Sequence, residues 1–175
     1  DAFIASLDSF QNTGVIVWAL SNDNSLGGAD IYAALPQSYS QLAEAWISVM
    51  NVDVVGGISS SNITRQSTTC GVTAAYCLAM DGTLVYGPSH NISNTDYYMS
   101  GTGTSYASPM ISGAVALLKQ VFPNHTPAQL VDRLLASANN TFFTASANVT
   151  FANGVQHGYN TTYGHGIPDL YAAVV

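Results

Sequence analysis

The sequence has few charged residues, and basic residues are almost missing. Only 7% of its 175 residues are charged, with three Lys and Arg against ten Asp and Glu, for a formal net charge of −7. A protein that binds nucleic acid releases counterions by placing many Lys and Arg side chains on phosphates. Anionic membranes attract the same basic side chains. We therefore expect neither nucleic acid nor an anionic membrane as a partner.

Cysteines and long apolar runs are scarce as well. No apolar run approaches the roughly 20 residues that a membrane-spanning helix needs, so we expect no membrane contact from this segment. The two cysteines, Cys70 and Cys77, are too few for a four-cysteine metal site. They either pair in a disulfide or serve as two small buried apolar side chains.

Apolar residues, in contrast, are plentiful, at 47% of the chain. The unbroken apolar runs at 14–20 and 45–52 are typical of strands that are buried on both faces of a parallel sheet. A chain of this length is sufficient for one domain. No internal repeat or interdomain linker divides it.

The heptapeptide GTSYASP, from Gly103 to Pro109, is the most informative motif. The residues after it carry no charge until Lys119, so we expect a helix that is apolar on nearly every face and therefore buried. Proline costs little only near a helix start, which puts the start close to Ser105. Free amides and the helix dipole would then favour an oxyanion beside this serine, as a nucleophile requires. The alternative is a helix cap without catalytic function.

Together with the following residues ISGAVALL, at 111–118, this heptapeptide resembles the serine block of the subtilisin-like serine proteases, or subtilases. The resemblance implies an α/β fold, with a parallel sheet flanked by helices, and Ser105 as the nucleophile. An alternative class is the α/β-hydrolase esterases, whose nucleophilic serine lies in a Gly-x-Ser-x-Gly motif. Ala107 stands where their second glycine should be, which counts against that class.

A second block fits the same family. Subtilases carry an asparagine just past a buried strand, and its side-chain amide donates to the oxygen of the tetrahedral intermediate; Asn22 has this position. Without the resemblance, an asparagine that closes a strand is only a turn former. In the family the residue before this asparagine is usually glycine, whereas in this chain it is Ser21. The pocket wall that the resemblance implies is Ala19, Leu20 and Ser21, which offers no anion and so favours apolar or small substrate residues.

Two further segments extend the resemblance over nearly the whole chain. Residues 70–79 are similar to a segment of subtilases that Gram-negative bacteria secrete as autotransporter passengers. Residues 163–170 resemble the glycine-rich turn that leads into the last helix of the family. A secreted or cell-surface protein is implied, and in such a protein a disulfide between Cys70 and Cys77 is favoured.

The other two members of a subtilase triad are not found. The family order is Asp, His, Ser, with both partners upstream of the asparagine, and the surroundings of Asp1 and Asp8 do not match it. The histidines are His90, His125, His157 and His165. We expect none of them to be the general base. His125 precedes a helix cap, His90 and His157 fall in polar loops, and His165, between two glycines, is expected to make a structural hydrogen bond.

Residues 1–175 are therefore predicted to be the C-terminal portion of one subtilisin-like peptidase domain. Its expected partners are the N-terminal portion of the same protease, which carries the Asp and His, and a polypeptide substrate. A serine without its base is a weak nucleophile, so we expect this chain alone to be inactive. The alternative is a noncatalytic binding or structural module derived from a subtilase.

No cofactor is expected to be required, and the motifs predict no metal site. The loop residues Asp23, Asp30 and Asp53 can hold a structural calcium ion, as in some subtilases. The alternative is that these are solvated turn carboxylates.

The remaining segments have simpler predictions. We expect a hairpin-like stretch at 58–86, a polar loop at 88–100, and loop or short strands at 139–162. Thr126 to Gln129 forms a capping box with proline at the first helical position, which predicts an amphipathic helix after it.

Overall fold

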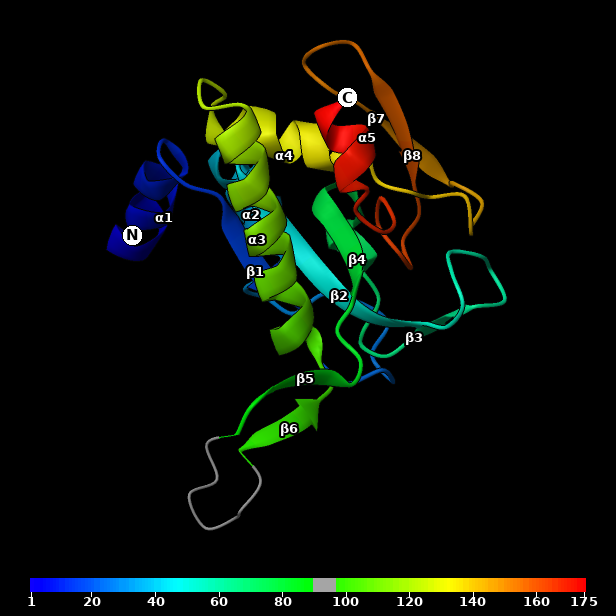
Figure 1. Ribbon diagram of the computed structural model, residues 1–175. Helices are drawn as coiled ribbons and strands as arrows, with labels where there is room; N and C mark the ends of the chain where they lie inside the picture. Colours follow the sequence, from blue (N-terminus) through cyan, green and yellow to red (C-terminus); the bar gives the residue numbers. More distant parts are fainter. Residues whose placement is uncertain (90–96) are drawn as a thin grey trace.

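The computed structural model describes residues 1–89 and 97–175 and has a small sheet at its centre (Figure 1). Three strands run parallel: β1 (Ile16–Ala19), β2 (Trp46–Val54) and β4 (Cys77–Asp81). A short strand, β3 (Ile63–Arg65), pairs antiparallel with the end of β2. The predicted α/β class with a parallel sheet is thus confirmed.

Strand β2 is the middle of the sheet, and its first seven residues, from Trp46 to Val52, are buried. The prediction of a strand at 45–52 is confirmed. The strand predicted at 14–20 is shorter, and within β1 only Ile16 is buried. The prediction that this strand is buried on both faces is wrong for the described residues, because Val17, Trp18 and Ala19 are partly exposed. Strand β1 pairs only with β2 and is an edge strand there.

The predicted hairpin at 58–86 is wrong. Strand β3 pairs with β2, whereas β4 follows a 3-10 helix, η2 (Gly71–Tyr76), and runs parallel to β2 on its other side. The reason lies far away in sequence: the amides of Cys70 and Gly71 donate to the carbonyls of Thr162 and Thr161. Local glycine and turn patterns carry no information about such a partner.

Helix α3 (Thr104–Val121) packs against the sheet with one face only (Figure 1). Ala107, Ile111 and Leu118 on that face are fully buried. On the outer side Leu117 is 55% exposed. The helix begins where predicted, but the prediction that nearly every face is buried is wrong for the described residues.

Pro109 was expected near the helix start, where a proline costs little, but it lies past the first turn of α3. It is the sixth residue of α3, past the first four amides that lack an intrahelical acceptor. The helix therefore loses the hydrogen bond that an amide at this position would donate to the Ser105 carbonyl. The start of the helix at Thr104 is unaffected.

A hairpin of β5 (Val85–Pro88) and β6 (Tyr98–Gly101) leads into α3 and extends away from the sheet in Figure 1. The predicted polar loop at 88–100 is therefore wrong at its end, where Tyr98 begins a strand whose amides pair with β5. Residues 90–96, with His90 among them, lie outside the described residues.

The C-terminal part packs on the sheet face that α3 covers and along the outer edge of β4. Phe142 and Ile167 also pack with Met50 and Val52 of the opposite face. Helix α4 (Pro127–Ala136) has the predicted capping box between Thr126 and Gln129. The short strands predicted within 139–162 are confirmed as an antiparallel pair. The elements not yet given are α1 (Ala2–Gln11), α2 (Leu35–Ser38), η1 (Ser40–Ala43), β7 (Ala147–Thr150), β8 (Gln156–Tyr159) and α5 (Leu170–Val174).

The two outer edges of the parallel strands differ. On the outer edge of β4, the Cys77 carbonyl accepts from the His165 amide at 2.9 Å and the Ala79 amide donates to the Gly166 carbonyl at 2.8 Å. The outer edge of β1 has no partner strand in the described ranges. Among the described helices none is long and apolar enough to cross a membrane.

Candidate active site

Ser105 is the second residue of α3, and its side chain is exposed. The hairpin β5–β6 delivers the chain to Gly103, which caps the helix. A Cβ atom on Gly103 would lie 3.0 Å from the Asn22 Oδ1 atom, so this close approach requires glycine. The serine hydroxyl thus stands at the start of this helix, where the Tyr106 and Ala107 amides donate to the Gly103 carbonyl.

Asn22 follows the end of β1 and reaches the same helix start. The Thr104 amide donates to Asn22 Oδ1 at 2.8 Å. The Thr104 hydroxyl lies 2.6 Å from the Leu20 carbonyl and 3.1 Å from Asn22 Oδ1, so its single proton goes to the nearer carbonyl. Because Oδ1 is held by Thr104, the Nδ2 group is the end of the carboxamide that remains available to a ligand.

The fold therefore brings together two groups that lie 83 positions apart in sequence. Ser105 offers a hydroxyl and its backbone amide, and Asn22 offers a side-chain amide donor at the same helix start. Two such donors near a hydroxyl are the arrangement that stabilises the oxyanion of an acyl-transfer reaction. This grouping is the candidate active site.

The three residues of the implied pocket wall differ in exposure. Ala19 and Ser21 are partly exposed, whereas Leu20 is 2% exposed and packs with Ala33 and Met50 in the core. The Leu20 side chain is thus directed into the core, and its carbonyl serves as an acceptor for Thr104. Only Ala19 and Ser21 can present side chains to a substrate at this wall.

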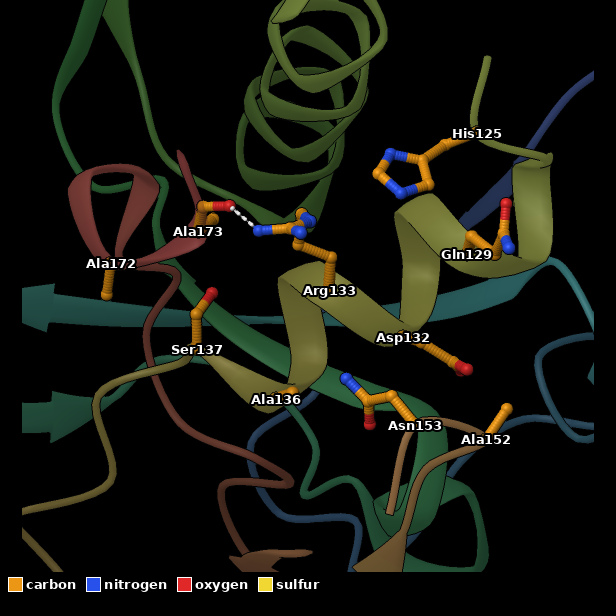
Figure 2. Close-up of a pocket in the computed structure, with 10 residues that line it drawn as sticks. All are labelled: His125, Gln129, Asp132, Arg133, Ala136, Ser137, Ala152, Asn153, Ala172 and Ala173. Carbon is orange, nitrogen blue, oxygen red and sulfur yellow. Dashed lines mark hydrogen bonds between the residues drawn. The ribbon is translucent and has the colours of Figure 1, made fainter. Parts of the chain in front are cut away.

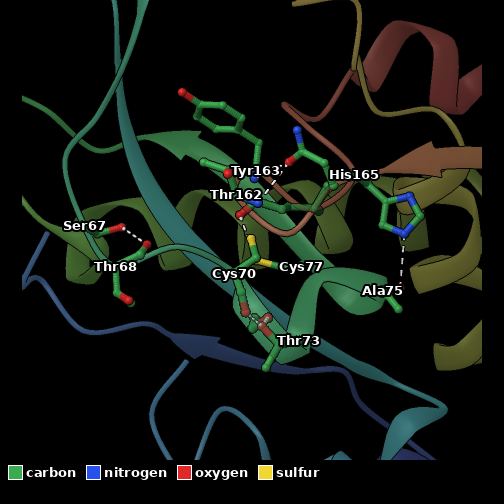
Figure 3. Close-up of a disulfide and its surroundings, with 12 residues drawn as sticks. Ser67, Thr68, Cys70, Thr73, Ala75, Cys77, Thr162, Tyr163 and His165 are labelled. Atoms are coloured by element: carbon green, nitrogen blue, oxygen red, sulfur yellow. Dashed lines mark hydrogen bonds between the residues drawn. A yellow bond between two sulfur atoms is a disulfide. The ribbon is translucent and has the colours of Figure 1, made fainter. Parts of the chain in front are cut away.

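Two histidines meet far from this site, in the C-terminal part. His165 is fully buried, and its Nε2 lies 3.1 Å from the Ala75 carbonyl (Figure 3). Its Nδ1 lies 2.9 Å from Nδ1 of His157. His157 Nε2 in turn lies 2.8 Å from the Ala138 carbonyl. Burial is the main cause that lowers the pKa of His165 to about 4. The structural hydrogen bond predicted for His165 is confirmed, while His157 lies in β8 and not in a polar loop.

Tautomers of this pair follow from its partners. A carbonyl only accepts, so both Nε2 atoms must carry a proton. The Nδ1 atoms of the two rings contact each other at 2.9 Å. Both rings are fully used by these contacts, so neither is free to act as a base for Ser105.

His125 lies at a separate cavity of about 700 Å³ between α4, α5 and the turn after β7 (Figure 2). Burial raises the pKa of Asp132 there. The Arg133 guanidinium donates to the Ala173 carbonyl at 2.7 Å and packs 4.0 Å from the centre of the Phe122 ring. No residue of the α3 start lines this cavity, so it is not part of the candidate active site.

The predicted disulfide is confirmed: Cys70 and Cys77 are joined, with an S–S distance of 2.04 Å and a Cα–Cα distance of 6.0 Å. It closes a loop around η2 (Figure 3). The turn before α5 packs on this loop, since the Cys70 amide donates to the Thr162 carbonyl at 3.1 Å.

The carboxylates considered for calcium have local partners. Asp23 accepts from the hydroxyl and the amide of Ser25 at 2.6 and 2.9 Å, and these bonds lower its pKa. Asp30 accepts from the amides of Tyr32 and Ala33. The described parts of the chain hold no group of three or more His, Cys, Asp or Glu residues that could bind a metal ion. Calcium at Asp53 and these turns stays a prediction.

The sequence did not indicate several residues that shape the site. Thr104 lies inside the motif, yet nothing in the pattern predicts that it holds Asn22. Gly82 falls within the stretch predicted as a hairpin, but a Cβ there would lie 2.6 Å from the Gly103 carbonyl oxygen. The buried Asn51 reaches the Gly82 amide. These contacts join three separate segments, and no local signal could have revealed them.

Comparison with known proteins identifies the class to which this site belongs. The profile of the subtilase family, Peptidase_S8, matches residues 5–166. The chain therefore belongs to the subtilase family and has the fold of a serine peptidase domain. The family match confirms the resemblance of the GTSYASP block to the subtilases.

Particular relatives agree with this assignment. Serotype-specific antigen 1 of Mannheimia haemolytica is 27% identical over 167 residues, which cover 94% of this chain and 16% of that protein. An extracellular serine protease of Serratia marcescens is 26% identical over 134 residues, which cover 66% of this chain and 12% of that protein. The chain thus spans only a minor part of the length of these relatives.

Solved structures show the same fold. Fervidolysin from Fervidobacterium pennivorans, a keratinolytic enzyme related to subtilisin, superposes with a TM-score of 0.64 at 25% identity, over 97% of this chain and 24% of that one. The self-cleaved protease domain of PatA has a TM-score of 0.62 at 21% identity, over 97% of this chain and 52% of that one.

Proposed function

We propose that this chain supplies the nucleophile and one oxyanion donor of a serine endopeptidase. The observation that carries the proposal is the hydrogen bond from the Thr104 amide to Asn22 Oδ1, which holds the Asn22 carboxamide one residue before Ser105. A hydroxyl and an amide donor held together at a helix start fit acyl transfer to serine.

The proposed reaction proceeds in two steps. The Ser105 Oγ atom forms a bond to the carbonyl carbon of a peptide, and the proton of its hydroxyl passes to a general base. The carbon–nitrogen bond then breaks, and the base returns the proton to the leaving amine. Water hydrolyses the resulting ester and restores the hydroxyl. Asn22 Nδ2 and an amide of α3 stabilise the negative oxygen in both steps.

We further propose that the general base and its carboxylate belong to another portion of the same protease domain. Three features support this division. The outer edge of β1 has no partner strand in the described ranges. The outer face of α3 leaves Leu117 and Val121 more than half exposed. None of the described histidines hydrogen-bonds to the Ser105 hydroxyl, since the rings of His157 and His165 are used elsewhere.

Active-site labelling with a fluorophosphonate tests this function. The chain is incubated with the probe alone and together with the remaining portion of the domain, supplied separately or joined to it. We expect little labelling of the chain alone and strong labelling of Ser105 when the other portion is present, because only then can the hydroxyl lose its proton. Ser105→Ala is the matched control and should abolish the labelling.

Two results would contradict the proposal. Strong labelling of Ser105 in the isolated chain would refute the need for another portion. Absence of labelling in the complete domain, while it is folded, would favour the alternative of a noncatalytic module derived from a subtilase.

We propose a polypeptide as the substrate and an extracellular or cell-surface location for the protein. The location is supported by the disulfide between Cys70 and Cys77, which persists in oxidising compartments. It is also supported by the names of the relatives, an extracellular protease and a serotype antigen. Ala19 and Ser21 present no anion to the substrate, which favours apolar or small residues before the scissile bond.

A further inference from the structure

Asn51 is the one fully buried asparagine of the central strand, and its side chain is only half satisfied. It is 0% exposed in the middle of β2. Its Oδ1 accepts from the Gly82 amide at 2.7 Å, which fixes the orientation of the carboxamide. Its buried Nδ2 has no hydrogen-bond partner among the described residues. Leaving a donor unpaired in the core costs free energy, and the hydrogen bond to Oδ1 offsets part of this cost.

The contact to Gly82 leads directly to the candidate active site. The Gly82 carbonyl accepts from the Gly103 amide at 3.0 Å, and Gly103 precedes Ser105 by two residues. A Cβ on Gly82 would lie 2.8 Å from the Ala107 amide nitrogen, so Gly82 packs tightly under the first turn of α3. The Asn51 side chain is therefore linked through Gly82 to the turn before Ser105.

The backbone of Asn51 is linked to the segment that carries Asn22. Its amide donates to Ser67 Oγ at 2.8 Å. The next residue, Thr68, donates its amide to the Ser21 carbonyl at 3.0 Å, directly before Asn22. One residue of the central strand is thus connected to both segments that meet at the oxyanion position.

We propose that Asn51 is a positioning residue of the active site, which sets the Ser105 turn relative to Asn22 through Gly82 and Gly103. The inference rests on the proposed peptidase function. Asn51 does not touch the substrate; it acts through the turn. Catalysis needs the nucleophile and the oxyanion donors in one fixed geometry, and a displacement of about 1 Å can cost on the order of 100-fold in rate.

The test compares Asn51→Ala with Ser48→Ala in the complete domain. Ser48 is the matched control, because it is also fully buried on β2 and its hydroxyl bonds to Thr73 at 2.8 Å, away from the turn. We expect Asn51→Ala to lower kcat by about 10- to 100-fold with little change in KM, since the chemical step and not substrate binding is affected. Ser48→Ala should leave kcat almost unchanged.

Two further variants keep the test decisive. Asn51→Asp retains an oxygen that can accept from the Gly82 amide, and it should recover most of the lost kcat at a pH where the buried carboxyl is protonated. Asn51→Leu refills the volume that alanine leaves empty. If Asn51→Ala does not fold, Asn51→Leu should show the same loss of kcat. An unchanged kcat in a folded Asn51→Leu or Asn51→Ala domain would overturn the proposal, as would an equal loss in Ser48→Ala.

A readout that is independent of catalysis separates this proposal from the peptidase function. Hydrogen–deuterium exchange is measured on the peptide that contains Gly103 in the unaltered chain, Asn51→Leu and Ser48→Ala. Faster exchange in Asn51→Leu alone supports the link to the turn even if the domain proves inactive. Equal exchange in all three proteins would refute the link even if the domain is a peptidase.

Discussion

At Asn22 the two ends of one carboxamide have different functions. Its Oδ1 atom is held by the Thr104 amide at 2.8 Å, which is a structural contact. Its Nδ2 group is the proposed oxyanion donor. Because the two ends can be altered separately, the residue offers a direct test of the site.

We predict that Asn22→Asp and Asn22→Leu both lower kcat of the complete domain on the order of 100- to 1,000-fold, since both lack the amide donor. Only Asn22→Leu should also lower the free energy of unfolding, because it leaves the Thr104 amide without an acceptor. Steady-state kinetics and urea unfolding give the two quantities. A kcat near that of the unaltered domain in Asn22→Asp would contradict the role of Nδ2.

Individual residues were predictable where the motif itself contains them. Ser105, Asn22 and the two cysteines could be named from the sequence, because each has a recognisable neighbourhood. Thr104 and Asn51 could not be assigned, because their function depends on partners in other segments. A hydrogen bond from a glycine amide to the side-chain oxygen of a buried asparagine 31 positions away leaves no local pattern.

Among the elements, the turn before α5 shows how a remote segment fixes local structure. It packs on the disulfide loop, and His165 contacts the Ala75 carbonyl of η2. Gly164 and Gly166 both have a positive φ, and a Cβ on Gly164 would clash with the Cys77 carbonyl. The predicted hairpin at 58–86 failed here, since the sequence carries no sign that this turn covers the edge of β4.

We predict that the stability of the chain falls as the pH drops from about 6.5 to about 4, partly because of His165. Its pKa is about 4 in the folded state and 6.5 in its reference state, so the unfolded chain binds more protons in this range. Full protonation would cost up to about 3 kcal/mol of the free energy of unfolding.

Urea unfolding at several pH values measures this slope. His165→Gln should reduce the slope of the unfolding free energy against pH. His125→Gln changes a histidine at the separate cavity beside α4 and should leave this slope unchanged. A slope that is the same in the unaltered chain and in His165→Gln would contradict the assignment to His165.

In the molecule as a whole, one sheet edge and one helix face lack cover in the described ranges. Strand β1 has an open outer edge. The outer side of α3 exposes Leu117, and Phe3 and Phe10 of α1 are about half exposed. Exposed apolar surface of this kind marks an interaction site or favours self-association.

We predict that the isolated chain self-associates and that Leu117→Gln weakens this association. Loss of an exposed apolar side chain should change the free energy of unfolding by no more than about 0.5 kcal/mol. Sedimentation velocity measures the association. Ile31→Gln is the control, because Ile31 is 78% exposed but does not belong to α3. An equal effect of both substitutions would show that the α3 face is not the contact.

The sequence alone determined the α/β class, the start of α3 close to Ser105, the capping box of α4 and the residues of the family motifs. These features depend on neighbours within a few positions, where backbone hydrogen bonding and apolar spacing act. Only the tertiary structure decided the parallel pairing of β4 and the exposed face of α3. It also decided the contacts of Asn22 with Thr104, of Gly82 with Gly103, and of Asn51 with Gly82. Their physical cause is contact between segments distant in sequence, which a pattern of neighbouring residues does not record.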